Sequence, residues 1–351
     1  MTRLFRRPSN HSSTRPGSRT APGRALVGLA AVAVSTAVLA GCGLGDTLAG
    51  VQDAPREVGD TAPVSAESAE AIAARVLTDA TRAREASGAE AKQLRAKALT
   101  GTALTVTNAD SRLARVGSTS TEPVTKATPP KVLGISRGNS WPRVMLVQSS
   151  REDGRTALNV LVSESATDPF KLASSAAMQP GTSVAALDSL DQGSPLNPQG
   201  TGLAVTPKAL LAEYAASLRY PKPATAEHVS SSDVFARAVR ANAKSQADSF
   251  AKLASLSQTH TVQPDNTVVI SLKDGGAVVF GLLERTDTIT LKPSGKSLTP
   301  SADFQKLLGK KTLTKRAQMH TYETVVFTVP PKTGPASLVA VDETLVSAKG
   351  E

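Results

Sequence analysis

Two serines lie in sequence contexts that could support nucleophilic catalysis. Ser136 stands between two glycines in the run Gly134-Ile135-Ser136-Arg137-Gly138, and Ser249 precedes Lys252 by three residues, about one helical turn. A serine hydroxyl becomes a nucleophile when a neighbouring base removes its proton and preorganised donors stabilise the oxyanion that forms. This chemistry requires a sharp strand-to-helix turn around Ser136, or a lysine aimed at Ser249.

Neither serine context is complete. The first matches the G-x-S-x-G pattern of serine hydrolases, but residues 139–142 and another strand follow where that chemistry needs a helix. Two of the three motifs of penicillin-recognising enzymes are resembled by Ser249 with Lys252 and by Lys332-Thr333-Gly334. In those enzymes the second motif lies on a strand, but Pro330-Pro331 just before Lys332 disfavours a central strand at this position. We therefore predict a hairpin turn at Gly134–Gly138 and no catalytic residue. A cell-wall hydrolase or acyl-transfer enzyme using a serine nucleophile is the alternative hypothesis.

The remaining candidates for chemistry are three histidines, His228, His260 and His320, which lie far apart in the sequence. None has a second ligand at the spacing typical of a metal site. Gly295-Lys296-Ser297 lacks the upstream glycine that a phosphate-binding loop needs. The sequence therefore predicts neither a metal nor a cofactor.

The strongest short motif is Leu39-Ala40-Gly41-Cys42, which contains the only cysteine of the chain. Cys42 follows an uncharged stretch, 25–41, which is short for a membrane span of roughly 20 residues. The 24 residues before that stretch carry six arginines and no acid. This arrangement resembles the lipobox of bacterial lipoproteins. The resemblance implies cleavage before Cys42, recognition through Leu39, Ala40 and Gly41, and acylation of the Cys42 sulfur. We expect the protein to be lipid-anchored on the outer face of the cytoplasmic membrane.

Removal of residues 1–41 changes the charge balance of the chain. The formal charge of +10 falls to +4, because 34 basic and 30 acidic residues remain. The high isoelectric point is then mainly a property of the leader, which argues against a nucleic-acid partner. Without a second cysteine the protein forms no internal disulfide, so packing must stabilise it.

The pattern after the leader predicts two domains. Residues 42–63 are expected to be a lipidated cysteine and a flexible tether, 64–190 a first domain, 191–203 a linker and 204–351 a second domain. In the first, helices are expected from Ser65 and, with Ser87 and Glu90 as a capping box, through Leu99; four strands follow at 131–136, 143–148, 157–163 and 170–178.

The second domain is expected to repeat this order. Thr206 and Pro207 predict the start of a helix, and Ser232 or Asp233 caps a long one that continues to Leu253. Strands are expected at 267–272, 277–284 and 287–291, then a short helix at 301–308 and strands at 319–329 and 337–346.

Helices followed by antiparallel strands, twice over, predict an α+β fold of two domains, each with N-terminal helices packed on a curved antiparallel sheet. This order resembles the nuclear-transport-factor-like and cystatin-like folds. The alanine- and arginine-rich character is similar to that of surface lipoproteins of high-GC Gram-positive (actinobacterial) organisms.

Two groups of residues could contact a partner. Five cations without an intervening acid could contact anionic wall polymer or lipid headgroups, and four large aromatics could line a pocket for a small hydrophobic ligand under the curved sheet. We therefore expect a non-catalytic binding or assembly module that contacts such a ligand, a wall polymer or an envelope protein. The cations are Lys306, Lys310, Lys311, Lys315 and Arg316, and the aromatics are Trp141, Phe170, Tyr214 and Phe280.

Overall fold

The computed structural model describes residues 61–351 except 116–128, 152 and 301. The described residues belong to one compact unit. The predicted leader, the predicted lipobox from Leu39 to Cys42 and most of the predicted tether lie outside the described residues.

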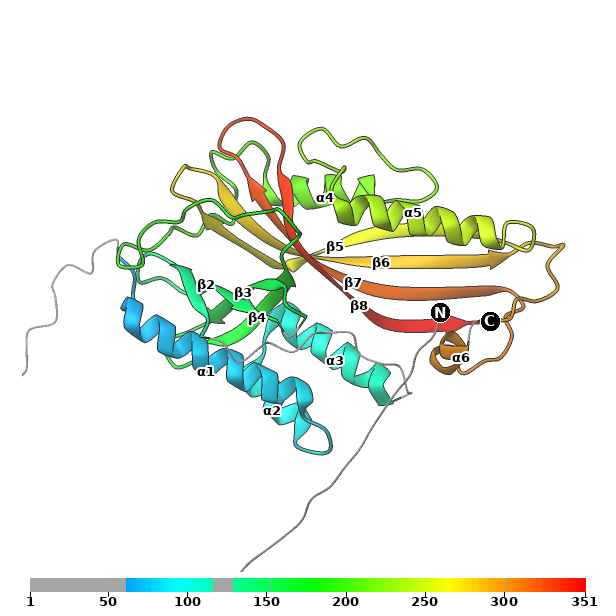
Figure 1. The fold of residues 1–351 in the computed structure, drawn as a ribbon, viewed down its shortest axis with the longest axis horizontal. Coiled ribbons are helices and arrows are strands. Elements are labelled where there is room, and N and C mark those ends of the chain that lie inside the picture. Colours follow the sequence, from blue (N-terminus) through cyan, green and yellow to red (C-terminus); the bar gives the residue numbers. More distant parts are fainter. Residues whose placement is uncertain (1–60, 116–128, 152, 301) are drawn as a thin grey trace, which may run out of the picture. The chain divides into compact units, whose positions relative to one another are not determined.

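The first half of the described chain consists of three helices followed by a four-stranded antiparallel sheet (Figure 1). Ser65 accepts a hydrogen bond from the N–H of Ser68 and so begins the first helix as predicted. The predicted capping box of Ser87 and Glu90 is wrong. Gly88 adopts a left-handed φ of 82°, and the N-cap residue of the second helix is Glu90, which makes no side-chain capping hydrogen bond. The elements are α1 (Ala66–Glu85), α2 (Ala91–Ala98), α3 (Gly101–Arg115), β1 (Lys131–Ile135), β2 (Arg143–Ser150), β3 (Thr156–Ser163) and β4 (Lys171–Ala177).

The second half also begins with helices and has longer strands, which form a sheet in the order β5-β6-β7-β8; a short helix, α6, lies between β6 and β7. The side chain of Thr206 caps α4 as predicted, and of the two candidates Ser232 and Asp233 it is Asp233 that caps α5. The fold is therefore α+β with two antiparallel sheets. The elements are α4 (Pro207–Ser217), α5 (Val234–Ser249), β5 (Ala254–Ser271), β6 (Ala277–Leu291), α6 (Ala302–Leu308), β7 (Arg316–Val329) and β8 (Ser337–Gly350).

The strands of the second sheet differ from the prediction at one end. The residues after Ser249 do not continue α5; the chain enters β5 at Ala254, and exposed and buried residues then alternate as far as Thr261. The two strands predicted on either side of Arg285 are one continuous strand, β6. Arg285 and Asp287 point to one face of the sheet and Glu284 to the other, each with partners there, so these charges do not interrupt the strand.

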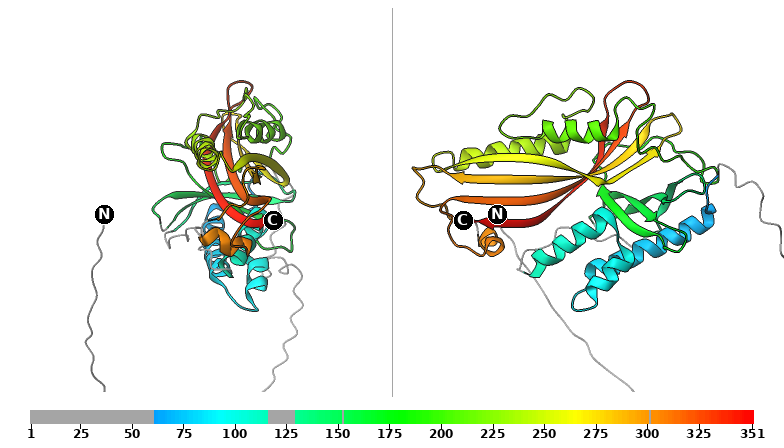
Figure 2. Two further views of the ribbon diagram at one scale, coloured as in Figure 1. Left: turned by 90° about the vertical axis from the view of Figure 1, so that its right-hand side faces the viewer. Right: turned by 180° about the vertical axis from the view of Figure 1, so that it is seen from behind.

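Helices cover one face of each sheet, and the two sheets pack together through their other faces. Leu210, Leu211 and Phe235 of α4 and α5 pack on odd-numbered residues of β6 and β7, while α1 packs on the first sheet. A third cluster joins Leu146 and Val160 of the first sheet to even-numbered residues of the second, including Phe280. Figures 1 and 2 show α4 and α5 along one face of the second sheet. Sheets buried on both faces explain the continuous apolar runs in β2, β3 and β6.

The segment predicted as a linker, 191–203, makes hydrogen bonds to both sheets. The N–H of Ser194 donates to the carbonyl of Ile135, and the N–H of Asn197 donates to the carbonyl of Val269. A backbone hydrogen bond also joins the two halves directly: the N–H of Gln179 donates to the carbonyl of Val339 at 2.8 Å. The two halves thus share a core in the structure, and independent folding of each remains a prediction.

Candidate functional site

The two serines that sequence reasoning singled out are held by backbone hydrogen bonds. Ser136 is only 3% exposed, and its Oγ accepts from the N–H of Val144 at 2.9 Å inside the β1–β2 hairpin. The Ser249 hydroxyl donates to the carbonyl of Gln246 at the end of α5, and Lys332 lies in the turn before β8 with a φ of 61°. The predicted hairpin at Gly134–Gly138 is confirmed, and the strand-to-helix turn that a hydrolase serine needs is not formed there.

The four aromatic residues predicted to line a pocket lie in separate places. Tyr214 of α4 is fully buried against the second sheet, where its ring meets that of Phe327 edge-on with 4.8 Å between the ring centroids and its hydroxyl donates to Asp233. Phe280 is fully buried between the two sheets. Phe170 packs against the core under α1, and Trp141 stacks on the guanidinium of Arg143. The structure therefore does not bring these four side chains together around one cavity.

A cavity of about 310 Å³ lies where the two halves meet. It is bounded by the chain between α2 and α3, by β2, β3 and β4, by the segment 191–203, and by an irregularity in β5. In that irregularity the register jumps from Gln263–Leu282 to Val268–Phe280, which loops residues 264–267 away from β6. The lining combines apolar and polar groups: Thr100, Gly101, Thr102, Pro142, Val144, Val162, Glu164, Ala173, Ser174, Leu196, Pro198, Asp265, Asn266, Thr267, Val268 and Val269.

Of the five predicted cations, Lys306 lies on α6, three lysines lie in the segment between α6 and β7, and Arg316 begins β7. Lys306, Lys310, Lys311, Lys315 and Arg316 are all exposed. The structure thus places this charge at the surface, and the identity of any partner remains a prediction.

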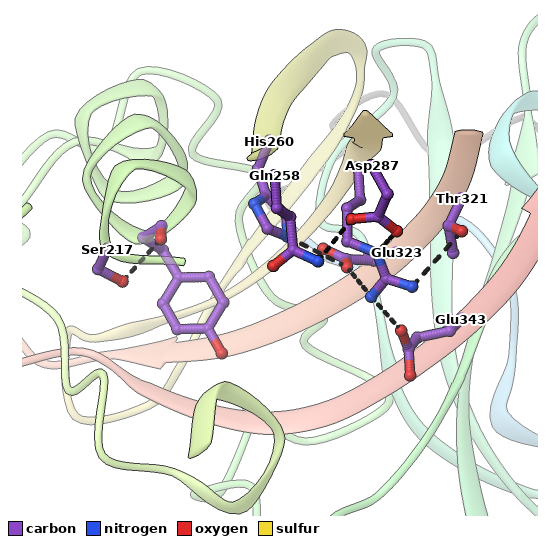
Figure 3. Close-up of polar contacts among 9 residues, drawn as sticks. Ser217, Gln258, His260, Asp287, Thr321, Glu323 and Glu343 are labelled. Carbon is purple, nitrogen blue, oxygen red and sulfur yellow. Dashed lines mark hydrogen bonds and ion pairs between the residues drawn. The ribbon is translucent and has the colours of Figure 1, made fainter. Parts of the chain in front are cut away.

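A buried polar cluster occupies the helix-covered face of the second sheet, beside the core under α4 (Figure 3). Its side chains come from all four strands of that sheet, at positions that continue the same inward face. Figure 3 shows the side chains of Gln258, Asp287, Thr321, Glu323 and Glu343 gathered over this face. His260 and Glu323 have side chains with 0% exposure, which is unusual for groups that carry or can carry charge.

Arg285 is the central cation of this polar cluster. Its guanidinium lies 2.9 Å from Glu323, 3.2 Å from Asp287 and 2.5 Å from Glu343, measured between nitrogen and carboxylate oxygen. Burial opposes the charge of Arg285, but the three carboxylates outweigh it and raise the pKa of Arg285. Glu323 and Glu343 are directly opposite each other on β7 and β8, and Arg285 offsets the repulsion between them.

Several buried atoms of the polar cluster have no hydrogen-bond partner among the described residues. They are Gln258 Oε1, Glu323 Oε2 and both ring nitrogens of His260, although His260 Nε2 lies 3.3 Å from Glu323 Oε1. The Gln258 amide donates to Asp287 at 2.6 Å, which fixes the orientation of its oxygen. A pocket of about 180 Å³ lies between this cluster and α5, lined by Gln258, Arg285, Asp287 and Glu343 on the sheet side. Buried polar atoms without partners are costly, so such a site is suited to a polar ligand.

His228 and His320 are each paired with a glutamate near the surface. His228 Nδ1 lies 3.0 Å from Glu213, and His320 Nδ1 lies 2.8 Å from Glu284 on the opposite face of β6 from Arg285. Within the described ranges, no group of three or more histidine, cysteine, aspartate or glutamate side chains is arranged to hold a metal ion. No helix in the same part of the chain combines the length and apolarity needed to cross a membrane.

The sequence did carry a signal for the polar cluster. Ser255-Leu256-Ser257-Gln258-Thr259-His260 alternates polar and apolar residues with the period of a strand, and Glu284-Arg285-Thr286-Asp287 alternates charges. What the sequence did not show is the pairing of Gln258 with Asp287 and of His260 with Arg285 across β5 and β6.

Comparison with known proteins identifies a family for the chain. No curated protein and no solved structure matches it. The model of the family described as "Domain of unknown function (DUF8094)" matches residues 63–350, which include both sheets, the cavity between the halves and the polar cluster. The chain therefore belongs to the DUF8094 family.

Proposed function

We propose that this protein is a non-catalytic, lipid-anchored binding protein of the cell envelope, and that the cavity between its two halves binds a small, mainly apolar molecule. The observation that carries the proposal is the cavity of about 310 Å³, which falls in the size range of small-molecule sites, about 300–1,000 Å³. Val144, Val162 and Val269 are buried in its wall and supply apolar contact, while Glu164 and Asn266 provide polar groups that could orient a ligand.

The position of the cavity also supports a binding role. Small-molecule sites occur preferentially at the boundary between structural units, where side chains from several elements converge. Here the irregularity in β5 and the segment 191–203 contribute residues that the regular sheets could not supply. The serines offer no comparable support for the alternative enzyme, because the Ser136 oxygen already accepts from a buried backbone N–H.

A direct test is the binding of a fluorescent apolar probe, 1-anilinonaphthalene-8-sulfonate, to the full chain purified in detergent below its micelle concentration. Ala173→Phe fills the cavity from β4, and Leu196→Phe fills it from the segment 191–203, where Leu196 is only partly buried. We expect both variants to lose the probe, whereas Ala241→Phe on the exposed face of α5 keeps it. Equal probe binding by all folded variants would contradict the assignment of the cavity as the ligand site.

The anchor is proposed from the lipobox-like motif and is tested separately. If Cys42 is acylated, 18 residues separate it from the first described residue, Thr61, and these can span at most about 60 Å. The folded part would then stay close to the membrane. Two acyl chains give nearly permanent membrane binding at about 0.8 kcal/mol per buried methylene. Cys42→Ala, or inhibition of the lipoprotein signal peptidase, should release or mislocalise the protein, while mass spectrometry showing an intact leader would contradict the proposal.

The exposed basic patch of α6 favours a second contact, with anionic wall polymer or lipid headgroups. Near an anionic membrane surface each cation contributes about 1 kcal/mol. In the Cys42→Ala chain, which has no acyl anchor, replacing Lys310, Lys311 and Lys315 with glutamine should reduce cosedimentation with vesicles that contain anionic lipid and leave binding to neutral vesicles unchanged. Replacing Lys92, Lys97 and Lys131, which are exposed elsewhere, serves as the control.

A further inference from the structure

The pocket between α5 and the second sheet is distinct from the cavity between the halves. Its volume is about 180 Å³, and its sheet side is formed by Gln258, Arg285, Asp287 and Glu343. Asn242 and Gln246 of α5 line the opposite side, so the walls are largely polar. No residue is shared with the lining of the cavity between the halves.

The charge around this pocket is negative. Glu323, Asp287 and Glu343 carry three carboxylates, and Arg285 is the cation that contacts them. Since the guanidinium already lies within 3.2 Å of all three, it has little capacity left for an anionic ligand. Three carboxylates and one guanidinium give these four side chains a formal charge of −2. The field in the pocket therefore attracts a cation.

The atoms left without partners point to the same kind of ligand. Gln258 is 5% exposed and lines the pocket, and its Oε1 has no donor among the described residues. Behind it, Glu323 Oε2 also lacks a donor. Both atoms are obligate hydrogen-bond acceptors, and an ammonium group offers three donors and no acceptor. An anion or an ether would add further acceptors to a site that already has too many.

We propose that this pocket binds a small organic ammonium ion, with Gln258 Oε1 accepting from the ammonium group and Glu343 and Asp287 supplying the attracting charge. At roughly 30 Å³ for each water-sized group, the volume accommodates about six non-hydrogen atoms. That is the size of a short alkyl diamine. The ligand class does not depend on the proposal for the larger cavity, because the two sites have no residue in common.

The test is calorimetric titration of the full chain in detergent with 1,4-diaminobutane, with 1,4-butanediol and butyrate as neutral and anionic counterparts. We expect heat of binding only with the diamine, and weaker binding at higher salt. Gln258→Met removes the acceptor while preserving size, and should weaken the diamine by about 10- to 100-fold, as expected for a hydrogen bond to a charged group. Glu343→Gln should weaken it by several-fold, since Glu343 is 43% exposed and its charge is partly screened.

A matched control is Glu284→Gln, which makes the same charge change on the opposite face of β6. It should leave diamine binding within a factor of two of the unmodified protein. The proposal is overturned if the diamine does not bind at millimolar concentration, or if butyrate binds instead. It is also overturned if Glu284→Gln lowers the affinity for the diamine as much as Glu343→Gln does. Should Gln258→Met fail to fold, Gln246→Leu on α5 tests the same pocket from its other wall.

Discussion

Replacing Arg285 with methionine should strongly destabilise the protein. Methionine keeps much of the length of the arginine stem, so the change removes charge and hydrogen bonds more than volume. The substitution leaves Glu323, with a side chain that is 0% exposed, and Asp287, 7% exposed, without their cation. Breaking a buried ion pair by removal of one partner costs about 3–5 kcal/mol, because the remaining charge is left uncompensated.

The geometry places Arg285→Met within that range. Glu323 is fully buried and already has one oxygen without a partner, which favours the upper end. Glu343 can turn toward solvent, and the amide of Gln258 still donates to Asp287, so these two carboxylates recover part of the loss. We therefore expect a loss of about 3–4 kcal/mol in the free energy of unfolding at pH 7.

Urea unfolding followed by circular dichroism measures this loss as a shift in the midpoint at constant slope. Arg82→Met is the matched control, because Arg82 is 73% exposed and lies 3.7 Å from Asp79 on the surface of α1. It should change the midpoint little, as is typical of exposed pairs. Similar small losses for Arg285→Met and Arg82→Met would refute the view that the cluster is a buried, mutually dependent network.

Three further predictions concern other parts of the fold. Burial opposes ionisation of Glu213, but hydrogen bonds from the backbone N–H of His228 and Glu227 lower the pKa of Glu213 below its ordinary 4.5. The ionised carboxylate of Glu213 therefore stabilises the fold above pH 4.5, and this stabilisation is lost as the pH falls through the lower pKa that Glu213 has in the folded protein. In Glu213→Gln the midpoint of urea unfolding should accordingly fall less steeply as the pH is lowered. An unchanged dependence of the midpoint on acidic pH would contradict this. Gly281→Ala places a Cβ 2.6 Å from Leu211 Cδ2 and should cost about 1–3 kcal/mol in thermal or urea unfolding, with a smaller loss in a Leu211→Ala background. Ser136→Ala removes the acceptor of the buried Val144 N–H and should cost about 1–3 kcal/mol without affecting ligand binding; a stable variant that loses a measurable hydrolytic activity would instead favour the enzyme hypothesis.

The sequence by itself determined the order and type of most elements. Helix starts at Ser65, Thr206 and Asp233 could be predicted because their side chains cap the first turn, a local interaction. The α+β class followed from the change of period between helices and strands. Elements whose signal is weak or broken by charge were misjudged: α3 was not predicted, and β6 was divided at Arg285.

Only the tertiary structure decided which residues meet. Phe280 and Phe327 look alike as large apolar strand residues in the sequence, yet Phe280 lies between the sheets and Phe327 lies under α4, because the two faces of the sheet pack against different layers. The cavity depends on the irregularity in β5 and on the segment 191–203, and the polar cluster depends on the register of four strands. Strand register and the packing of two sheets arise from contacts between distant residues, so no local pattern specifies them.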